Sequence, residues 1–100
     1  MDNQEIAITV VSKVTGVAKS TILSRTRKWP AVEARQFIVL LLSRDGATDE
    51  SISWMLKRGR CAILKSRHNA TDSLRISKIF REKYDKISAL YEHQKSLRVS

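Results

Sequence analysis

Six large apolar residues follow one another in the middle of this chain, from Phe37 to Leu42. They lie in a segment that starts near Pro30, runs to about Arg44 and has no residue that interrupts a helix. A helical turn takes about 3.6 residues, so six in succession leave the helix without a polar face. The run is too short to cross a bilayer, which takes about 20 apolar residues. The sequence therefore predicts a buried central helix with other elements packed around it.

Residues that break helices are rare elsewhere, because the chain has three glycines and one proline. Short helices joined by tight turns are therefore expected. In the first segment, Asn3 to Thr15, Asp2 precedes Glu5 at the spacing of a capping box, and Gly16 can end the helix. The ITVV stretch would also suit a strand, but no other segment offers a partner strand, so we expect a helix.

Capping residues place the next three helices. Ser20 can cap a short second helix, and Pro30 suits the first position of the central one. Asp45 and Gly46 are expected to end the central helix, and Thr48 can cap a fourth. The inner side of that fourth helix is expected to hold Ile52, Met55 and Leu56.

The last two helices follow a turn expected at residues 58–59. The fifth helix is expected to start at about Arg60 and to end at Asn69-Ala70. Thr71 or Asp72 would then cap a long amphipathic C-terminal helix. Its apolar stripe is expected to hold Ile76, Phe80, Tyr84, Ile87 and Tyr91.

These elements are expected to form one all-α domain of about six helices over residues 1–100, with its core at about 4–91. The domain is strongly basic, with a formal charge of +9. Residues 20–29 carry three cations and residues 57–68 carry five, and neither segment holds an Asp or Glu. A concentrated positive charge of this kind favours a polyanionic partner.

The second basic segment has the plan of a helix-turn-helix, a short helix and a tight turn followed by a basic helix that enters the major groove. Ala62 and Ile63 are expected to pack inward. The residues expected to face out are Arg60, Cys61, Lys65 and His68. Arg60 is best placed to bind guanine with its forked donors. Phosphate contacts are expected from Lys57, Arg58, Lys65 and Arg67. A solvated basic helix without a ligand is the alternative, but five cations without acids repel one another, which favours a binding role.

Arg25, Arg27 and Lys28 form another basic element just before the central helix. Basic segments in such a place often lie along the minor groove or the backbone of DNA. Trp29 could stack on a sugar, but we expect it to pack over the start of the central helix. Trp54 is expected at the edge of the core.

No set of residues for catalysis or for a metal is recognisable. Cys61 is the only cysteine, so no intrachain disulfide can form, and no His or acid is placed nearby to activate the thiol. His68 and His93 lack partners at ligand spacing. Neither a glycine-rich phosphate loop nor a signal peptide is apparent. We therefore expect a cytoplasmic, non-enzymatic protein that needs no metal or cofactor and binds no membrane.

Several features occur in a specific order over residues 4–91. They are Gly16-Val17 after the first helix, the loop SRTRKW, Ala34-Arg35-Gln36 before FIVLLL, Ile52 in the fourth helix, and KRGRCAI over residues 57–63. This order resembles the C-terminal DNA-binding domain (domain IV) of the bacterial replication initiator DnaA. The family's signature there is of the type [GK]-[RK]-D-[HR]-[ST]-T-V. The resemblance implies a Trp-repressor-like helix-turn-helix fold that binds short duplex sites.

By this resemblance, Arg60 takes the position of the residue that contacts bases. Cys61 and Ala62 take positions where hydroxyl groups bond to DNA, and the loop over residues 25–28 lies toward the minor groove. Gly59 replaces the signature Asp, and both hydroxyls are missing. Since a good base contact is worth ~1–3 kcal/mol, base readout is expected to be weakened or redirected relative to the family.

The sequence thus predicts a double-stranded DNA-binding domain of the DnaA domain IV type, acting at the nucleoid of a bacterium or from a phage or mobile element. The helix at about Arg60–His68 would enter the major groove, and the loop Arg25–Lys28 would grip the minor groove or backbone. Two alternatives remain open. One is a helical adaptor that binds an acidic protein, and the other is RNA binding through the same basic face.

Overall fold

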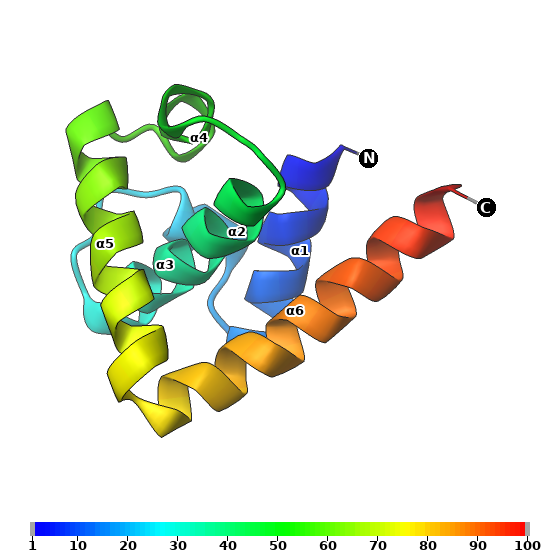
Figure 1. The fold of residues 1–100 in the computed structure, drawn as a ribbon. Helices are drawn as coiled ribbons and strands as arrows, with labels where there is room; N and C mark the ends of the chain where they lie inside the picture. Colours follow the sequence, from blue (N-terminus) through cyan, green and yellow to red (C-terminus); the bar gives the residue numbers. More distant parts are fainter. Residues whose placement is uncertain (1, 100) are drawn as a thin grey trace.

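The computed structural model describes residues 2–99, and the side chains of residues 2–97. Six helices and no strand occur within these residues. The helices are α1 (Asn3–Thr15), α2 (Lys19–Ile22), α3 (Trp29–Arg44), α4 (Asp49–Leu56), α5 (Arg60–Ile76) and α6 (Lys78–Val99) (Figure 1). The predicted all-α fold of about six helices is confirmed, and the ITVV stretch is helical.

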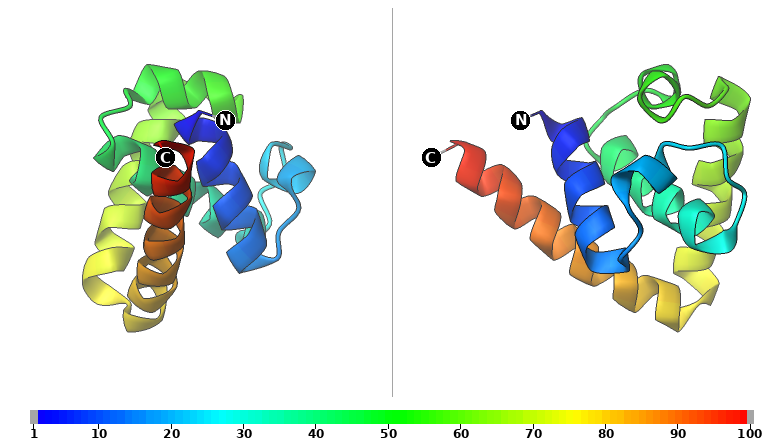
Figure 2. Two further views of the ribbon diagram at one scale, coloured as in Figure 1. Left: turned by 90° about the vertical axis from the view of Figure 1, so that its right-hand side faces the viewer. Right: turned by 180° about the vertical axis from the view of Figure 1, so that it is seen from behind.

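The central position predicted for α3 is confirmed. Residues 37–42 are all buried. Helices α1, α2, α4, α5 and α6 all contact α3, and α1 also packs against α6. In Figures 1 and 2, α5 and α6 meet at a corner, and α1 and α3 lie between their arms.

Local capping starts and ends several helices where the sequence predicts. Asp2 accepts a hydrogen bond from the Glu5 amide at 2.9 Å, and Gly16 ends α1 with φ at 78°. Thr48 Oγ1 accepts a hydrogen bond from the Ser51 amide at 3.1 Å at the start of α4. These caps involve residues close together in the chain, which is why the sequence pattern predicts them.

Two helices start slightly earlier than predicted. Helix α2 begins at Lys19 after Ala18, so Ser20 lies inside the helix and does not cap it. Helix α3 begins at Trp29, which makes Pro30 its second residue. The first turn of a helix has no acceptor for its N–H groups, so proline is tolerated there as well as at the first position.

The predicted end of the fifth helix at Asn69-Ala70 is wrong. Helix α5 continues to Ile76, and Ala70 is fully buried in the core. Neither Asn nor Ala prevents helical geometry, and burial of Ala70 seven residues after the buried Ile63 keeps both on one face.

Ser77 separates α5 from α6. Its backbone is extended, and its Oγ accepts a hydrogen bond from the Phe80 amide at 3.2 Å. Ser77 therefore caps α6, whereas Thr71 and Asp72, predicted as caps, lie inside α5. The Thr71 hydroxyl instead donates to the Arg67 carbonyl within that helix.

The apolar stripe of α6 is confirmed except at its predicted start. Phe80, Ile87 and Tyr91 are buried, and Tyr84 is partly buried. Ile76 belongs to the end of α5 and is 77% exposed. The stripe contacts the core through aromatic stacking, since the ring centroids of Phe80 and Phe37 lie 4.6 Å apart.

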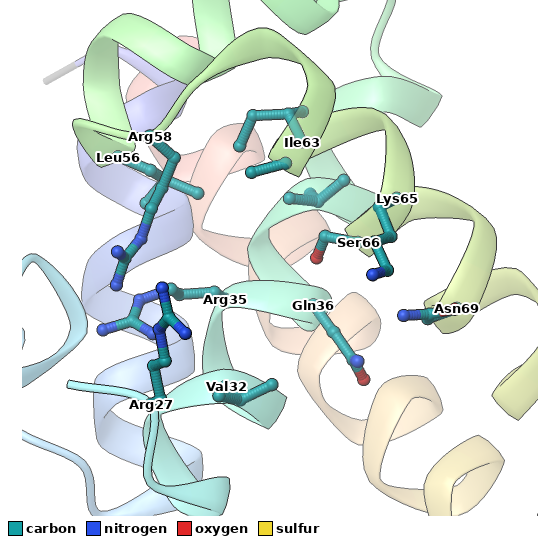
Figure 3. Close-up of a pocket in the computed structure, with 12 residues that line it drawn as sticks. Arg27, Val32, Arg35, Gln36, Leu56, Arg58, Ile63, Lys65, Ser66 and Asn69 are labelled. Atoms are coloured by element: carbon teal, nitrogen blue, oxygen red, sulfur yellow. The ribbon is translucent and has the colours of Figure 1, made fainter. Parts of the chain in front are cut away.

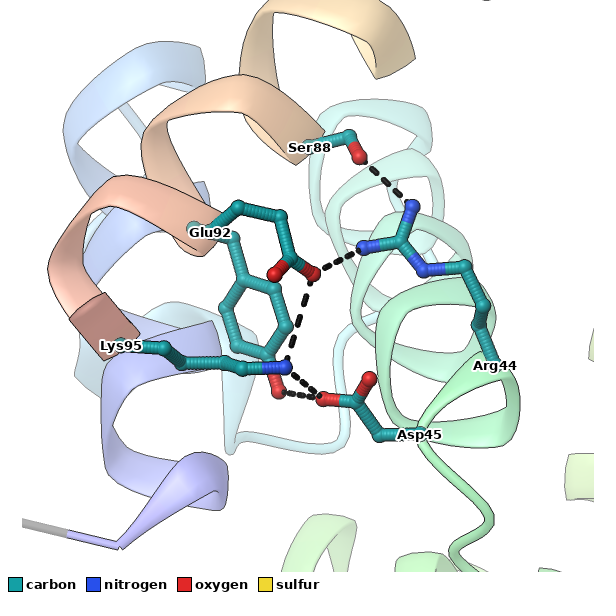
Figure 4. Close-up of polar contacts among 6 residues, drawn as sticks. Arg44, Asp45, Ser88, Glu92 and Lys95 are labelled. Atoms are coloured by element: carbon teal, nitrogen blue, oxygen red, sulfur yellow. Dashed lines mark hydrogen bonds and ion pairs between the residues drawn. The ribbon is translucent and has the colours of Figure 1, made fainter. Parts of the chain in front are cut away.

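A cluster of polar side chains, called here the Asp45 cluster, fixes the C-terminal end of α3 to α6 (Figure 4). It comprises Arg44, Asp45, Ser88, Tyr91, Glu92 and Lys95. The Asp45 carboxylate accepts hydrogen bonds from the Tyr91 hydroxyl and from Lys95 Nζ. Arg44 Nη2 lies 2.8 Å from Glu92 Oε1. The cluster thus pairs cations with acids across the two helices.

These contacts shift the pKa values of Asp45, Tyr91 and Lys95, and the hydrogen bond to Asp45 raises the pKa of Lys95. Burial acts to raise the pKa of the Asp45 carboxyl, but hydrogen bonds from Tyr91 and Lys95 hold it below its usual 3.8. Burial, followed by the hydrogen bond to Asp45, raises the pKa of Tyr91. At neutral pH Asp45 and Tyr91 therefore keep the charge states that their hydrogen bond requires.

Candidate nucleic-acid interface

Helices α4 and α5 pack against each other and are joined by a turn of three residues, Lys57, Arg58 and Gly59. The residue in the left-handed conformation is Lys57, at φ 56°, and not the glycine. Gly59 is extended (φ −66°, ψ 152°) and precedes α5 without a side chain to cap it. Two helices at a tight turn are therefore present as predicted, with a turn that begins one residue earlier.

The N-terminal half of α5 presents most of the predicted contact residues to solvent. Ile63 is buried as predicted. The exposed residues are Arg60, Cys61, Ala62, Leu64, Lys65 and His68. The prediction that Ala62 packs inward is wrong, because the buried face of α5 runs through Ile63 and Ala70 and Ala62 lies to one side of it.

Arg67 forms an ion pair with Asp49 at the start of α4. Its Nη2 and Nε donate to the two carboxylate oxygens at 2.9 and 3.2 Å. The hydrogen bond from Arg67 lowers the pKa of Asp49, and that from Asp49 raises the pKa of Arg67. The guanidinium predicted to hold a phosphate is thus engaged within the protein, where it ties α5 to α4.

Arg58 connects the turn to the segment between α2 and α3, called here the basic loop (residues 23–28). Its Nη2 donates to the Ser24 carbonyl at 2.8 Å. The two are 34 positions apart in the chain, so no local sequence pattern predicts this contact. The hydrogen bond places the basic loop beside the turn that leads into α5.

Arg35 is the functional residue that sequence reasoning missed. It is buried in α3, and its guanidinium donates to four backbone carbonyls, two at the end of α2 and two in the basic loop. The acceptors are Ile22, Ser24 and Thr26 at 2.7–2.8 Å and Thr21 at 3.4 Å. The sequence signal for its burial was a charged residue two positions before six consecutive apolar residues of the same helix. Burial, and then the charge of Arg58, lower the pKa of Arg35.

Arg35 and Arg58 hold the backbone of the basic loop, and three other cations project from it. Arg25, Arg27 and Lys28 are all exposed. Trp29 follows them and is more than half exposed, so it covers the start of α3 only in part.

Trp54 does not lie at the edge of the core as predicted, since it is 79% exposed on α4. The buried residues of this helix, Ile52 and Leu56, are four positions apart on its inner face. A residue midway between them points to the opposite side.

A pocket of about 500 Å³ lies between the basic loop, α3 and α5 (Figure 3). It is lined by Arg27, Val32, Arg35, Gln36, Val39, Leu56, Arg58, Ala62, Ile63, Lys65, Ser66 and Asn69. Four of these residues are cations and none is an acid. This pocket, called here the cationic pocket, brings together side chains from both basic segments.

No group of three or more His, Cys, Asp or Glu side chains is placed to hold a metal ion in the part of the chain that the structure describes. Among the same residues, no helix combines the length and apolar character needed to span a membrane. Comparisons with protein-family models, with curated proteins and with solved structures gave no match to the chain. The function is therefore inferred from the arrangement of side chains described above.

Proposed function

We propose that this protein binds double-stranded DNA, with the N-terminal half of α5 in the major groove and the basic loop on the adjacent minor groove or backbone. The observation that carries this proposal is a set of six exposed cations on neighbouring elements. Within the described residues, no hydrogen bond or ion pair is formed by the side chains of Arg25, Arg27, Lys28, Lys57, Arg60 and Lys65. They lie on the basic loop and on the turn and first half of α5, and the hydrogen bond from Arg58 to Ser24 connects the loop to the turn.

The first turn of α5 supplies the candidate base contacts. Arg60, Cys61 and Ala62 are exposed there, at the end where a helix in the major groove reaches base edges. The positive end of the helix dipole also favours nearby phosphates. The resemblance to DnaA domain IV supports the same orientation. Because Cys61 and Ala62 lack hydroxyl groups, we expect a target site different from that of the family.

Arg58 and Arg67 are assigned to positioning rather than to contact with DNA phosphates, and the guanidinium of Arg58 lies at the cationic pocket. Arg67 is held by Asp49, and Arg58 by the Ser24 carbonyl. Breaking either interaction to bind DNA would leave a partner unsatisfied. Their effect on DNA binding is therefore expected to come from the placement of α5 and the basic loop.

Selection from randomised duplexes, followed by fluorescence anisotropy, tests the proposal. With five cations at phosphates, log K should fall with log salt at a slope of about −4.5. A recovered sequence motif with that slope supports the proposal. Absence of binding to any duplex at low salt contradicts it, and preference for single strands or A-form helices would favour RNA instead.

Two substitutions separate base readout from phosphate contact. Arg60→Ala is expected to reduce the preference for the selected site, at a cost of about 1–3 kcal/mol, with little effect on random duplexes. Lys65→Ala is expected to weaken binding to all duplexes equally and to lower the salt slope by about 1. Lys78→Ala, on α6 and paired with Glu82, is the matched control. If Arg60→Ala and Lys65→Ala leave DNA binding unchanged but abolish binding to an acidic protein, the adaptor function is supported instead.

A further inference from the structure

One end of the cationic pocket is built from guanidinium groups. Figure 3 shows Arg58 and Arg27 reaching this end from opposite sides and meeting Arg35. The three residues come from the turn, the basic loop and α3. Arg35 and Arg58 give hydrogen bonds only to backbone carbonyls, and Arg27 gives none within the described residues. Three neighbouring cations without an acid repel one another, and an anion bound among them would relieve that repulsion.

The other end of the pocket carries neutral polar groups and one ammonium. Gln36, Asn69, Ser66 and Lys65 lie there, on the side away from the guanidinium groups (Figure 3). Gln36 is only 5% exposed, and its Oε1 is buried without a hydrogen-bond partner. A buried amide oxygen without a partner costs about 1–3 kcal/mol, so a partner is expected from outside the protein. Since this oxygen has no protein bond to lose, the amide can turn toward a ligand.

The rest of the pocket wall is apolar. It is formed by Val32, Val39, Leu56, Ala62 and Ile63. The volume lies within the range of about 300–1,000 Å³ typical of small-molecule sites. A free phosphate would use only the guanidinium end and leave the wall and Gln36 uncovered.

We propose that the cationic pocket binds a nucleoside monophosphate, with the phosphate among Arg27, Arg35 and Arg58 and the base beside Gln36 and Asn69. A tetrahedral phosphate accepts donors from several directions, which suits guanidinium groups that arrive from three elements. Amide side chains pair with the edges of bases, and Lys65 can donate to an exocyclic carbonyl oxygen or a ring nitrogen of the base. The flat base would cover the apolar wall.

Binding would oppose the proposed function, and this consequence rests on it. Arg27 and Lys65 line the pocket and also belong to the proposed DNA surface. A bound nucleotide would engage both, so nucleotide and duplex should weaken each other's binding by the same factor.

Calorimetric titration of the full chain with GMP and, separately, AMP in the absence of DNA tests the pocket. At least one of them should bind about tenfold more tightly than inorganic phosphate, which lacks the base, and than the matching nucleoside, which lacks the anion. Equal affinity for the nucleotide and inorganic phosphate would contradict the proposal, as would no binding of either nucleotide.

Three variants locate the site. Arg27→Gln removes an exposed cation and should weaken nucleotide binding about tenfold. Lys19→Gln removes an exposed cation of α2 outside the pocket and should leave it unchanged. Gln36→Met should also weaken binding while leaving the melting temperature equal or higher, because it removes the buried oxygen without a partner. Nucleotide binding that is insensitive to Arg27→Gln would overturn the proposal even if Gln36→Met failed to fold.

A competition experiment separates this inference from the proposed function. A nucleotide that binds the chain and displaces a duplex supports both. Nucleotide binding without any duplex binding removes the proposed function and leaves the pocket in place. Duplex binding without nucleotide binding overturns the pocket alone.

Discussion

Helix α3 uses charged side chains in opposite ways where it meets α6 and where it lines the cationic pocket. At the C-terminal end, Arg44 and Asp45 pair with Glu92 and Lys95 on α6. Toward the N-terminal end, Arg35 gives its hydrogen bonds to backbone carbonyls, and the cations that surround it face no acid. Charges are therefore paired where α3 meets α6, including Glu33 with Lys83, and the cations at the cationic pocket have no acid in its lining.

The difference separates two uses of charge. In the Asp45 cluster the charges satisfy one another, and the exposed Arg44–Glu92 pair contributes only about 0–1 kcal/mol, so its main effect is to orient α6. On the cationic side, repulsion among like charges is retained in the free protein. Binding of a polyanion relieves it, which makes this side the part of the molecule that gains most from a partner.

The largest expected effect comes from removing the guanidinium that organises the cationic pocket. Arg35→Met should destabilise the fold by about 3 kcal/mol, since it leaves carbonyls at the end of α2 and in the basic loop without their donor. Urea unfolding measures the change. Arg25→Met, in the same segment but exposed, is the control and should change stability by less than about 0.5 kcal/mol. Equal effects of the two would mean that Arg35 does not hold the loop.

Substitutions at two tyrosines of α6 test the contribution of the Asp45 cluster to stability. Tyr91→Phe removes the hydroxyl bonded to Asp45 and should cost about 1–2 kcal/mol, because hydrogen bonds to charged groups are stronger than neutral ones. Tyr84→Phe, also on α6 but without a hydrogen bond from its hydroxyl in the described residues, should cost less than about 0.5 kcal/mol. Thermal unfolding of both variants provides the comparison. DNA binding should be unchanged in either, and a loss of affinity would contradict the separation between the two regions.

The turn into α5 offers a test in which stability and binding change in opposite directions. Lys57→Gly should stabilise the protein by about 1 kcal/mol, because Lys57 is left-handed at φ 56° and glycine adopts this conformation without a steric penalty. Lys57→Ala removes the same charge but keeps the Cβ, so it should give no such gain. Both variants should weaken duplex binding equally and lower the salt slope by about 0.9. Equal stability of the two would argue against the left-handed turn in solution.

The smallest effect is expected at the start of α5. Gly59→Ser should stabilise the helix by a few tenths of a kcal/mol, roughly, since serine can cap it and Gly59 has a negative φ. The same change at Gly16, where φ is 78°, should destabilise the protein by about 1 kcal/mol. Guanidinium chloride unfolding of the two variants checks the signs. A gain at Gly16 or a loss at Gly59 would reverse the assignment of the two conformations.

Much of the fold could be predicted from the sequence because the signals are local. The caps at Asp2 and Thr48 and the left-handed end at Gly16 depend on neighbours in the chain. The end of α5 was predicted wrongly because Asn69-Ala70 is only a weak breaker, and packing of Ala70 against the core outweighs it.

Of the candidate site, the sequence predicted which segments are basic but not what each cation does. Charge and helical period placed Arg60 and Lys65 on the outer face of α5, and both are exposed. The same pattern could not distinguish Arg58 and Arg67, because their partners, Ser24 and Asp49, are distant in the chain.

The sequence by itself determined an all-α chain with a central buried helix and two basic segments, because apolar period, caps and net charge are properties of neighbouring residues. Only the tertiary structure decided that these segments share one surface. That decision rests on hydrogen bonds from Arg35 and Arg58 to backbone carbonyls of the basic loop and of the end of α2, a type of acceptor that every residue possesses and no sequence pattern marks.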